Sequence, residues 1–201
     1  MHKTDQITQQ QMQDSAINSA PEKGAIDLVV LSYMARKIRV LLHSMEHPIE
    51  TALPWLYYLQ ESRGRAHRIA IYAPQALPSL HDCAFVGFIS RKQQSIDPFI
   101  AHELHRVDQQ LLGELVGISG LLAYSSLELH AGNWYNLVLL NDASDRAHFK
   151  DIAIHRYAAY QLAPHYYEWI RLHSGTLHGG LAGALILQKT KYYRFQREKG
   201  R

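Results

Sequence analysis

A change in the spacing of apolar residues near Gly117 constrains the fold most strongly. Asp97 and Pro98 suit the cap and the first position of a helix. The apolar residues that follow recur every three or four positions: Ile100, Leu104, Val107, Leu111 and Leu115. From Ile118 onward the interval falls to two, which is typical of strands. The chain therefore joins a helix to a β-hairpin across Gly117, a residue that commonly ends helices.

The wider order of elements predicts an antiparallel sheet. Strands are expected at Arg68–Ala73, at Cys83–Ser90, on both sides of a turn at 130–133, at Tyr166–Ser174 and at Ala184–Phe195. A second helix is expected to begin at Asp142 or Ser144 and to run towards Leu162, before Pro164. Residues 83–174 then form a complete βαββαβ unit. This order predicts an α+β fold, a ferredoxin-like antiparallel sheet with helices on one face.

The N-terminal third gives weaker signals. Residues 1–24 are rich in Gln, Ser and Asp, which predicts a disordered arm. Ile26–Tyr33 and Ile38–Leu42 are dense in β-branched and apolar residues and predict a strand or a hairpin, whereas Pro48–Ser62 reads as a helix. We therefore expect one α+β domain over 25–196, followed by a basic tail at 197–201.

Composition excludes several classes of function. The net charge of +3 is small and Lys and Arg are dispersed before the tail, so no nucleic-acid footprint is expected. A single cysteine, Cys83, excludes an internal disulfide. No apolar run has the length of a membrane span and no secretory signal is apparent, so no membrane partner and a cytoplasmic location are expected. The thirteen histidines have no recurrent metal-ligand spacing.

The alternation within residues 118–178 locates a candidate site. The more apolar positions of each strand are expected to face the helices. The complementary positions combine aromatic and polar residues: Tyr124, Ser126, Glu128, His130, Trp134, Asn136, Val138, Tyr167, Trp169, Arg171 and His173. Such a face would pack against a second sheet in a homodimer or line a cavity for a ligand, unless it is simply an amphipathic surface.

In element order and in its aromatic second sheet face, the stretch 83–195 resembles the dimeric α+β barrel superfamily, in which two ferredoxin-like sheets close into a barrel. The resemblance implies a homodimer. Members of that superfamily include monooxygenases without cofactors, haem-binding and haem-degrading proteins, and isomerases, so the resemblance implies no single chemistry.

The leading hypothesis is a protein that handles a small apolar or aromatic molecule, with monooxygenase-like chemistry and no required cofactor. Arg171 and Asn136 would polarise a ligand oxygen and His173 would move a proton. The walls of the pocket would be aromatic: Tyr124, Trp134, Tyr167 and Trp169. The competing interpretation pairs Arg171 with Glu128 and places a hydrogen-bonded His173 at an interface.

Two further hypotheses stay open. A haem-binding or haem-processing protein would use His155 or His173 as the axial ligand. His155 shares a helical stripe with His148 and Ile152, which directs it away from the aromatic face. Alternatively, the aromatic face serves only for dimerisation and the protein is a non-enzymatic binding module.

Overall fold

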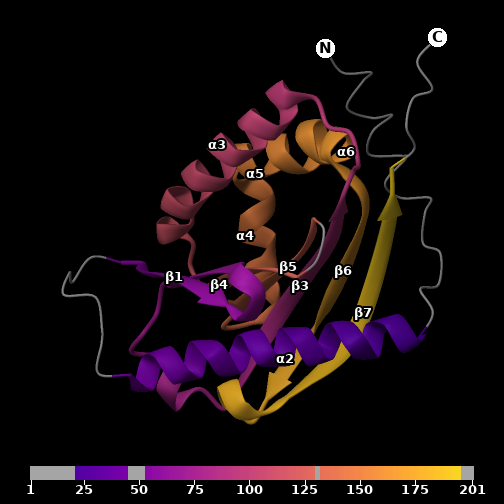
Figure 1. Cartoon of the computed structure of the whole chain (residues 1–201). Helices are drawn as coiled ribbons and strands as arrows, with labels where there is room; N and C mark the ends of the chain where they lie inside the picture. Colours follow the sequence, from indigo (N-terminus) through magenta and orange to yellow (C-terminus); the bar gives the residue numbers. More distant parts are fainter. Residues whose placement is uncertain (1–20, 45–52, 130–131, 196–201) are drawn as a thin grey trace.

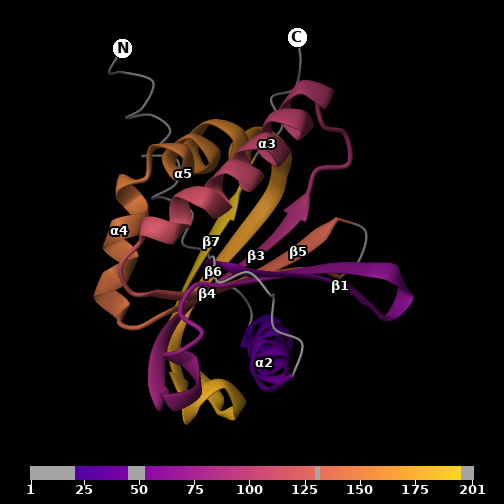
Figure 2. The ribbon, with the colours of Figure 1, turned by 90° about the vertical axis from the view of Figure 1, so that its left-hand side faces the viewer.

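The computed structural model describes residues 21–44, 53–129 and 132–195. Within these residues, seven strands form one antiparallel sheet in the order β1-β2-β4-β5-β3-β6-β7 (Figure 1). Helices lie on both sides of this sheet: α2 crosses one face, and α3 to α6 cover the other (Figure 2). The protein therefore has a mixed α+β architecture, as the sequence predicted.

The strands and helices have the following bounds. The strands are β1 (Trp55–Glu61), β2 (Arg65–Ile71), β3 (Asp82–Lys92), β4 (Leu121–Glu128), β5 (Asn133–Leu140), β6 (Tyr167–His178) and β7 (Ala184–Arg194). The helices are α2 (Pro21–His43), α3 (Pro98–Glu114), α4 (Arg146–Asp151), α5 (Ala153–Tyr157) and α6 (Ala163–Tyr166), with a π-helical turn, η5 (Ala158–Leu162), between α5 and α6. Short single turns lie at η1 (Ser62–Gly64), η2 (Leu77–Ser79), η3 (Leu115–Gly117), η4 (Ala143–Asp145) and η6 (Gly180–Ala182).

The predicted strand and helix order is confirmed from β3 to β6. Asp97 caps α3 by accepting a hydrogen bond from the Phe99 amide at 2.7 Å, and the helical turn that follows α3 ends at Gly117. Asp142 caps the helical segment after β5, but Pro164 lies within the first turn of α6 and does not end that segment. Strands β4 and β5 pair as a hairpin, and positions 130 and 131 of the expected turn lie outside the described residues.

The predicted strand at Ile26–Tyr33 and its continuation at Ile38–Leu42 are wrong, because both lie in helix α2. Its buried side recurs at helical intervals: Asp27, Leu31, Met34, Ala35 and Ile38. Its outer side is also apolar, with Ile26 and Val29 more than 60% exposed. These exposed apolar residues mask the amphipathic period. Helix α2 also begins at Pro21, inside the stretch 1–24 that was expected to be disordered; residues 1–20 and the tail from 196 lie outside the description.

The helix predicted over Pro48–Ser62 is also wrong where the structure describes it, since Trp55–Glu61 forms strand β1. The exposure of its side chains alternates strictly along the strand. Tyr58 and Leu56 lie on its outer side, so both faces of this edge strand carry apolar residues. Because apolar residues lie on both faces, their spacing in the sequence resembles that of an amphipathic helix. The segment nevertheless pairs as a strand with β2 along its whole length.

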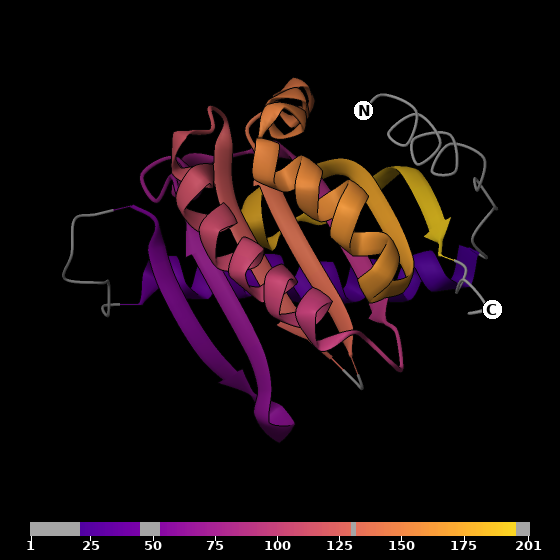
Figure 3. The same cartoon turned by 90° about the horizontal axis from the view of Figure 1, so that it is seen from above.

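Helix α2 corrects the expectation that helices lie on one face of the sheet. It packs closely, because Gly87 of β3 leaves room for Leu31, whose Cδ1 lies only 2.5 Å from where a Cβ of residue 87 would be. The largest apolar core lies between α2 and the sheet and includes Phe85, Ile89 and Leu137. On the opposite face, α3 and the α5–α6 segment run side by side over the strands (Figure 3) and bury two smaller clusters. Both faces of the sheet are therefore covered.

Candidate functional site

The predicted site residues lie on two different faces of the sheet. Ile89 of β3 is paired with Tyr135 on one side and with Arg171 on the other, so these residues share the face that α2 covers. Trp169 and His173 alternate onto the same face as Arg171. The opposite face carries the remaining predicted residues: Tyr124, Trp134, Asn136 and Tyr167. The expectation that one face holds all of them is wrong.

The reason for this error is that pairing with β3 determines which residues of β5 and which residues of β6 point to the same face of the sheet. The two strands are not neighbours, and each pairs with a different edge of β3. In sequence, Arg171 and His173 look like the polar face of a strand, yet in the structure both are buried. Because both faces of the sheet are covered, polarity alone could not assign its inner and outer sides.

Arg171 and His173 converge on Asp27 of helix α2. The Arg171 guanidinium donates two hydrogen bonds to the Asp27 carboxylate, from Nε and from an Nη, each 2.8 Å long. His173 contacts the same carboxylate through Nε2 at 2.9 Å and Thr190 Oγ1 through Nδ1 at 2.8 Å. Tyr135 donates its hydroxyl to Asp27 at 2.8 Å. A buried carboxylate thus fastens α2 to strands β5 and β6, and His173 extends the network to Thr190 of β7.

The groups of this cluster satisfy one another. Burial disfavours the charged form of Asp27, but the hydrogen bonds from His173 and Arg171 outweigh it and hold the pKa of Asp27 below its ordinary value. Both ring nitrogens of His173 are engaged, and its side chain is fully buried. The predicted proton transfer and haem ligation by His173 would therefore require the cluster to be dismantled. We assign Asp27, Arg171 and His173 to holding the fold together.

The other predicted residues make separate contacts on the α3–α6 face. Tyr124 donates its hydroxyl to Asn136 Oδ1 at 3.1 Å. Tyr167 packs edge-on against Phe88 with ring centroids 5.6 Å apart, and Trp134 is half-buried. His155 is half-buried beside Phe149, and burial lowers the pKa of its imidazole. Across the described part of the chain, His, Cys, Asp and Glu side chains form no cluster of three suited to a metal ion.

A second histidine on the α2 face repeats the contact pattern of His173. His67 of β2 contacts Glu61 Oε1 through Nδ1 and Ser125 Oγ through Nε2, each at 2.8 Å. Tyr33 of α2 donates its hydroxyl to the other Glu61 oxygen at 2.6 Å, and the Lys37 ammonium lies 3.7 Å from Oε1. The result is a chain of hydrogen bonds that runs from Tyr33 on the surface of α2 to Ser125 in the middle of the sheet.

The protonation states of this chain follow from burial and from its partners. Burial lowers the pKa of His67, although Glu61 opposes the shift, so the imidazole is neutral near pH 7. Burial raises the pKa of Glu61, but hydrogen bonds from Tyr33 and His67 reverse the effect and leave it lowered. Burial and the bond to Glu61 raise the pKa of Tyr33 to about 12. An ionised carboxylate therefore accepts from a neutral imidazole and a neutral phenol.

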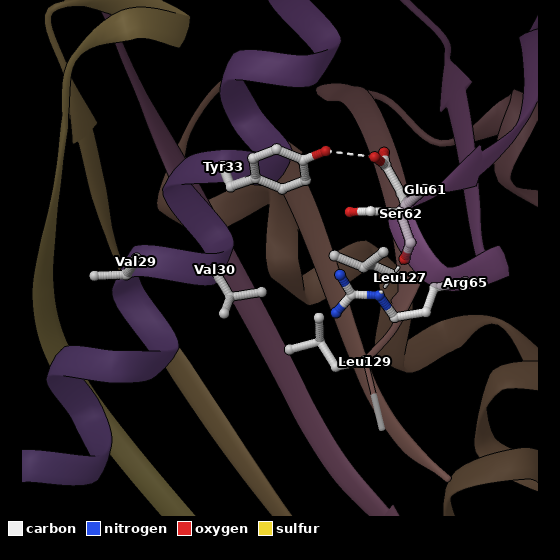
Figure 4. Close-up of a pocket in the computed structure, with 8 residues that line it drawn as sticks. All are labelled: Val29, Val30, Tyr33, Glu61, Ser62, Arg65, Leu127 and Leu129. Carbon is white, nitrogen blue, oxygen red and sulfur yellow. Dashed lines mark hydrogen bonds between the residues drawn. The ribbon is translucent and has the colours of Figure 1, made fainter. Parts of the chain in front are cut away.

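A pocket of about 340 Å³ opens beside Glu61, between α2 and the first strands of the sheet (Figure 4). Eight residues line it: Val29, Val30, Tyr33, Glu61, Ser62, Arg65, Leu127 and Leu129. Four of them are aliphatic, and the other four carry a phenol, a carboxylate, a hydroxyl or a guanidinium group that can form hydrogen bonds. Small-molecule sites usually have volumes of about 300–1,000 Å³ and combine apolar walls with a few convergent polar groups. The pocket fits that description.

The β1–β2 turn places two opposite charges at the pocket. Glu61 and Arg65 are opposite one another across the hairpin, so their side chains share one face. Between them, Arg63 and Gly64 have φ values of +67° and +72°, a left-handed conformation that favours glycine at the second position. Arg65 donates from Nε to Ser62 O at 3.0 Å, and its guanidinium extends towards Leu127 and Leu129 (Figure 4).

The order carboxylate, imidazole, hydroxyl is also that of a catalytic triad, but the setting of Ser125 differs from that of a nucleophile. Ser125 is fully buried in the middle of β4, where its backbone is paired with Ile69 on one side and Leu137 on the other. An attacking serine must instead reach the substrate from an exposed turn. The Ser125 hydroxyl therefore fixes the orientation of His67, which in turn positions Glu61.

Four residues of this site were not predicted from the sequence: Glu61, Arg65, His67 and Ser125. A signal was present, because Glu61 and Arg65 flank Ser62-Arg63-Gly64, a turn-forming stretch, and His67 follows two positions after Arg65. That signal was lost when Pro48–Ser62 was assigned to a helix. Tyr33, Val29 and Val30 were lost in the same way, since the pocket wall exists only if residues 26–33 form a helix.

Along the described part of the chain, none of the helices has both the length and the apolar character needed to cross a membrane. Comparison of the chain with protein-family models, with curated proteins and with solved structures found no match.

Proposed function

We propose that this protein binds a small, largely apolar molecule in the pocket between α2 and the β1–β2 hairpin. The observation that carries the proposal is the pocket of about 340 Å³, whose lining combines four aliphatic side chains with four polar ones. Helix α2 supports the pocket rigidly, because Asp27 fastens it to the sheet and Leu31, Met34 and Ile38 pack beneath it.

The state of the polar groups favours binding over acid–base catalysis. A general base works best when its pKa lies near the operating pH. Glu61 instead has a lowered pKa, and both of its oxygens already accept hydrogen bonds. The raised pKa of Tyr33 likewise makes it a poor proton donor to a substrate. These groups suit a fixed, polar end wall that orients a ligand.

For the framework, we propose that residues 82–178 form a ferredoxin-like unit. Its support is the order strand, helix, strand, strand, helix, strand, combined with the sheet order β4-β5-β3-β6. A dimeric barrel needs the second sheet face to pair with another copy, and here α2 occupies that face. We therefore propose a ferredoxin-like unit that does not form a dimeric barrel, with the ligand bound beneath α2.

The test is a fluorescence titration with phenylnaphthylamine, an uncharged probe whose emission rises in apolar surroundings. The variant Val30→Phe fills the pocket from α2, because Val30 lines it. The matched control is Val40→Phe, which makes the same change on the same helix at a side chain that is 61% exposed and outside the lining.

We expect saturable binding to the native protein, a loss of at least tenfold in affinity in Val30→Phe, and little change in Val40→Phe. Circular dichroism of both variants checks that the fold is retained. The proposal is wrong if the native protein does not bind the probe, or if a folded Val30→Phe protein binds it as well as the native protein does.

A further inference from the structure

We infer that the pocket selects an apolar molecule that carries a single negative charge, such as a small hydrophobic carboxylate, and that Arg65 binds the anionic group. This inference rests on the proposed function, because it names the class of ligand for the same pocket. Three features of the pocket support it. Arg65 has free hydrogen-bond donors, the charge of the Glu61 carboxylate is offset by Lys37, and aliphatic side chains lie beside the guanidinium.

Arg65 has donors left for a ligand. Of its N–H groups, Nε donates to Ser62 O at 3.0 Å, and this is the single hydrogen bond that Arg65 makes within the described residues. That bond anchors the planar guanidinium and leaves both terminal nitrogens for other acceptors. A guanidinium in this setting matches the two oxygens of a carboxylate, which it can bind with two parallel hydrogen bonds.

Glu61 does not compete for this guanidinium. The two residues are opposite one another on the hairpin, yet the Glu61 oxygens bind Tyr33, His67 and Lys37 instead of Arg65. The Lys37 ammonium, 3.7 Å from Glu61, offsets the charge of the carboxylate. With His67 neutral, Glu61, Lys37 and Arg65 together carry one surplus positive charge, that of Arg65. An anionic ligand is therefore favoured over a cationic one.

The side chains next to the guanidinium determine the chemical character of the rest of the ligand. Leu127 and Leu129 lie beside Arg65 in the close-up, and Val30 faces them from α2 (Figure 4). A ligand whose anionic group contacts Arg65 would lay its body against these three aliphatic side chains. Strongly polar anions such as inorganic phosphate would leave the aliphatic surface unpaired, so the chemistry specifies an anion with a hydrocarbon or aromatic body.

The experiment compares two probes that share the same ring systems and differ by one charge. Anilinonaphthalene sulfonate carries a sulfonate, and phenylnaphthylamine carries no charge. Each is titrated into the native protein, Arg65→Gln, Arg65→Lys and the control Arg36→Gln, which removes an exposed arginine of α2 outside the pocket. Competition by octanoate and by octanol then tests a carboxylate against its uncharged counterpart.

We expect Arg65→Gln to weaken binding of the sulfonate probe by about ten- to a hundredfold, since a charge-assisted hydrogen bond contributes about 1.5–3 kcal/mol. Binding of the uncharged probe should change by less than about threefold, because it lacks the group that Arg65 binds. Arg65→Lys should fall between, because it keeps the charge and loses the paired donors. Octanoate should displace the sulfonate probe better than octanol does.

The outcomes separate this inference from the proposed function. If both probes bind the native protein and Val30→Phe abolishes both, but Arg65→Gln leaves the sulfonate probe unaffected, then the pocket binds ligands and the assignment of an anion to Arg65 is wrong. An equal loss for both probes in Arg65→Gln also overturns it. If neither probe binds the native protein, the proposed function fails and the inference fails with it.

Discussion

Two histidines beneath helix α2 make the same pair of contacts and have different surroundings. His173 and His67 each join a carboxylate on one ring nitrogen to a hydroxyl on the other, and both are buried. The carboxylate of the first chain, Asp27, is sealed and also binds Arg171. The carboxylate of the second chain, Glu61, reaches the wall of a pocket. The same local motif therefore fastens a helix in one place and lines a pocket in the other.

The difference arises from how α2 covers the sheet. Near its N-terminus, Asp27 points into the sheet and Leu31 packs into the space above Gly87, which leaves no room for solvent. Farther along the sheet, α2 faces the β1–β2 hairpin, where Val30 and Tyr33 form one wall of the pocket. Buried polar networks contribute to both stability and function. Which contribution dominates here depends on access from solvent.

The largest effect is expected from Asp27→Ala. This change leaves Arg171 buried without its carboxylate partner, and breaking a buried ion pair in this way costs about 3–5 kcal/mol. Denaturant unfolding measures the loss in free energy of unfolding. Asp27→Asn, which keeps the size of the side chain, should lose less. A cost below about 1 kcal/mol for Asp27→Ala would show that the sealed chain does not hold α2 in place.

The next effect concerns the close approach of α2 and β3. In Gly87→Ala the new Cβ would meet the end of Leu31, so the side chain and the helix must shift, at an expected cost of about 2 kcal/mol. Gly113→Ala provides the matched control in α3, since nothing lies within 4 Å of its added Cβ. That variant should gain about 0.5–1 kcal/mol from helix propensity. Equal effects of the two changes on thermal unfolding would contradict the tight packing on the α2 face.

Glu61→Ala should cost less than Asp27→Ala, about 1 kcal/mol. It removes the acceptors of His67 and Tyr33, but water that enters from the pocket can hydrate the groups left behind. Unfolding in denaturant measures this cost under the same conditions as for Asp27→Ala. If Glu61→Ala proves the more destabilising of the two, then the Glu61 chain, and not the Asp27 chain, is the main structural network, which would contradict the roles given to them here.

The smallest effect is on the pH dependence of stability. Burial holds the pKa of His67 below its unfolded value of about 6.5. The unfolded chain therefore binds more protons in the window below that value, so stability should fall as the pH drops from about 7 towards the folded pKa. His67→Gln should flatten part of this slope, and His102→Gln, at an exposed site on α3, should leave it unchanged. His155, whose pKa is also lowered, should maintain a residual slope in the same direction.

How far the fold could be predicted depended on how clearly each element separates its apolar and polar sides. Helix α3 has an Asp97 cap and one apolar stripe, and hairpin β4–β5 alternates, so both were predicted. Helix α2 and strand β1 carry exposed apolar residues on their outer sides, among them Val29 and Tyr58, so both were assigned to the wrong class.

The candidate site was less predictable than the fold. Arg171 and His173 were correctly predicted to lie on the same face of one strand. Their partner Asp27 lies more than a hundred residues away, on a helix that the sequence pattern had indicated to be a strand. The His67 chain joins three segments in the same way, through Tyr33, Glu61 and Ser125. Only the Glu61–His67 pair, six residues apart across a turn, left a local signal; the partners that are distant in sequence cannot be found from spacing within one strand.

The most direct test of the central claim is methyl NMR of the protein titrated with phenylnaphthylamine. We predict that the methyl signals of Val29, Val30, Leu127 and Leu129 shift with a common saturation curve. Those of Val138 and Leu172, which lie on the opposite face under α3 to α6, should stay in place. Shifts confined to Val138 and Leu172 would contradict the account, because they would place the ligand on the other side of the sheet.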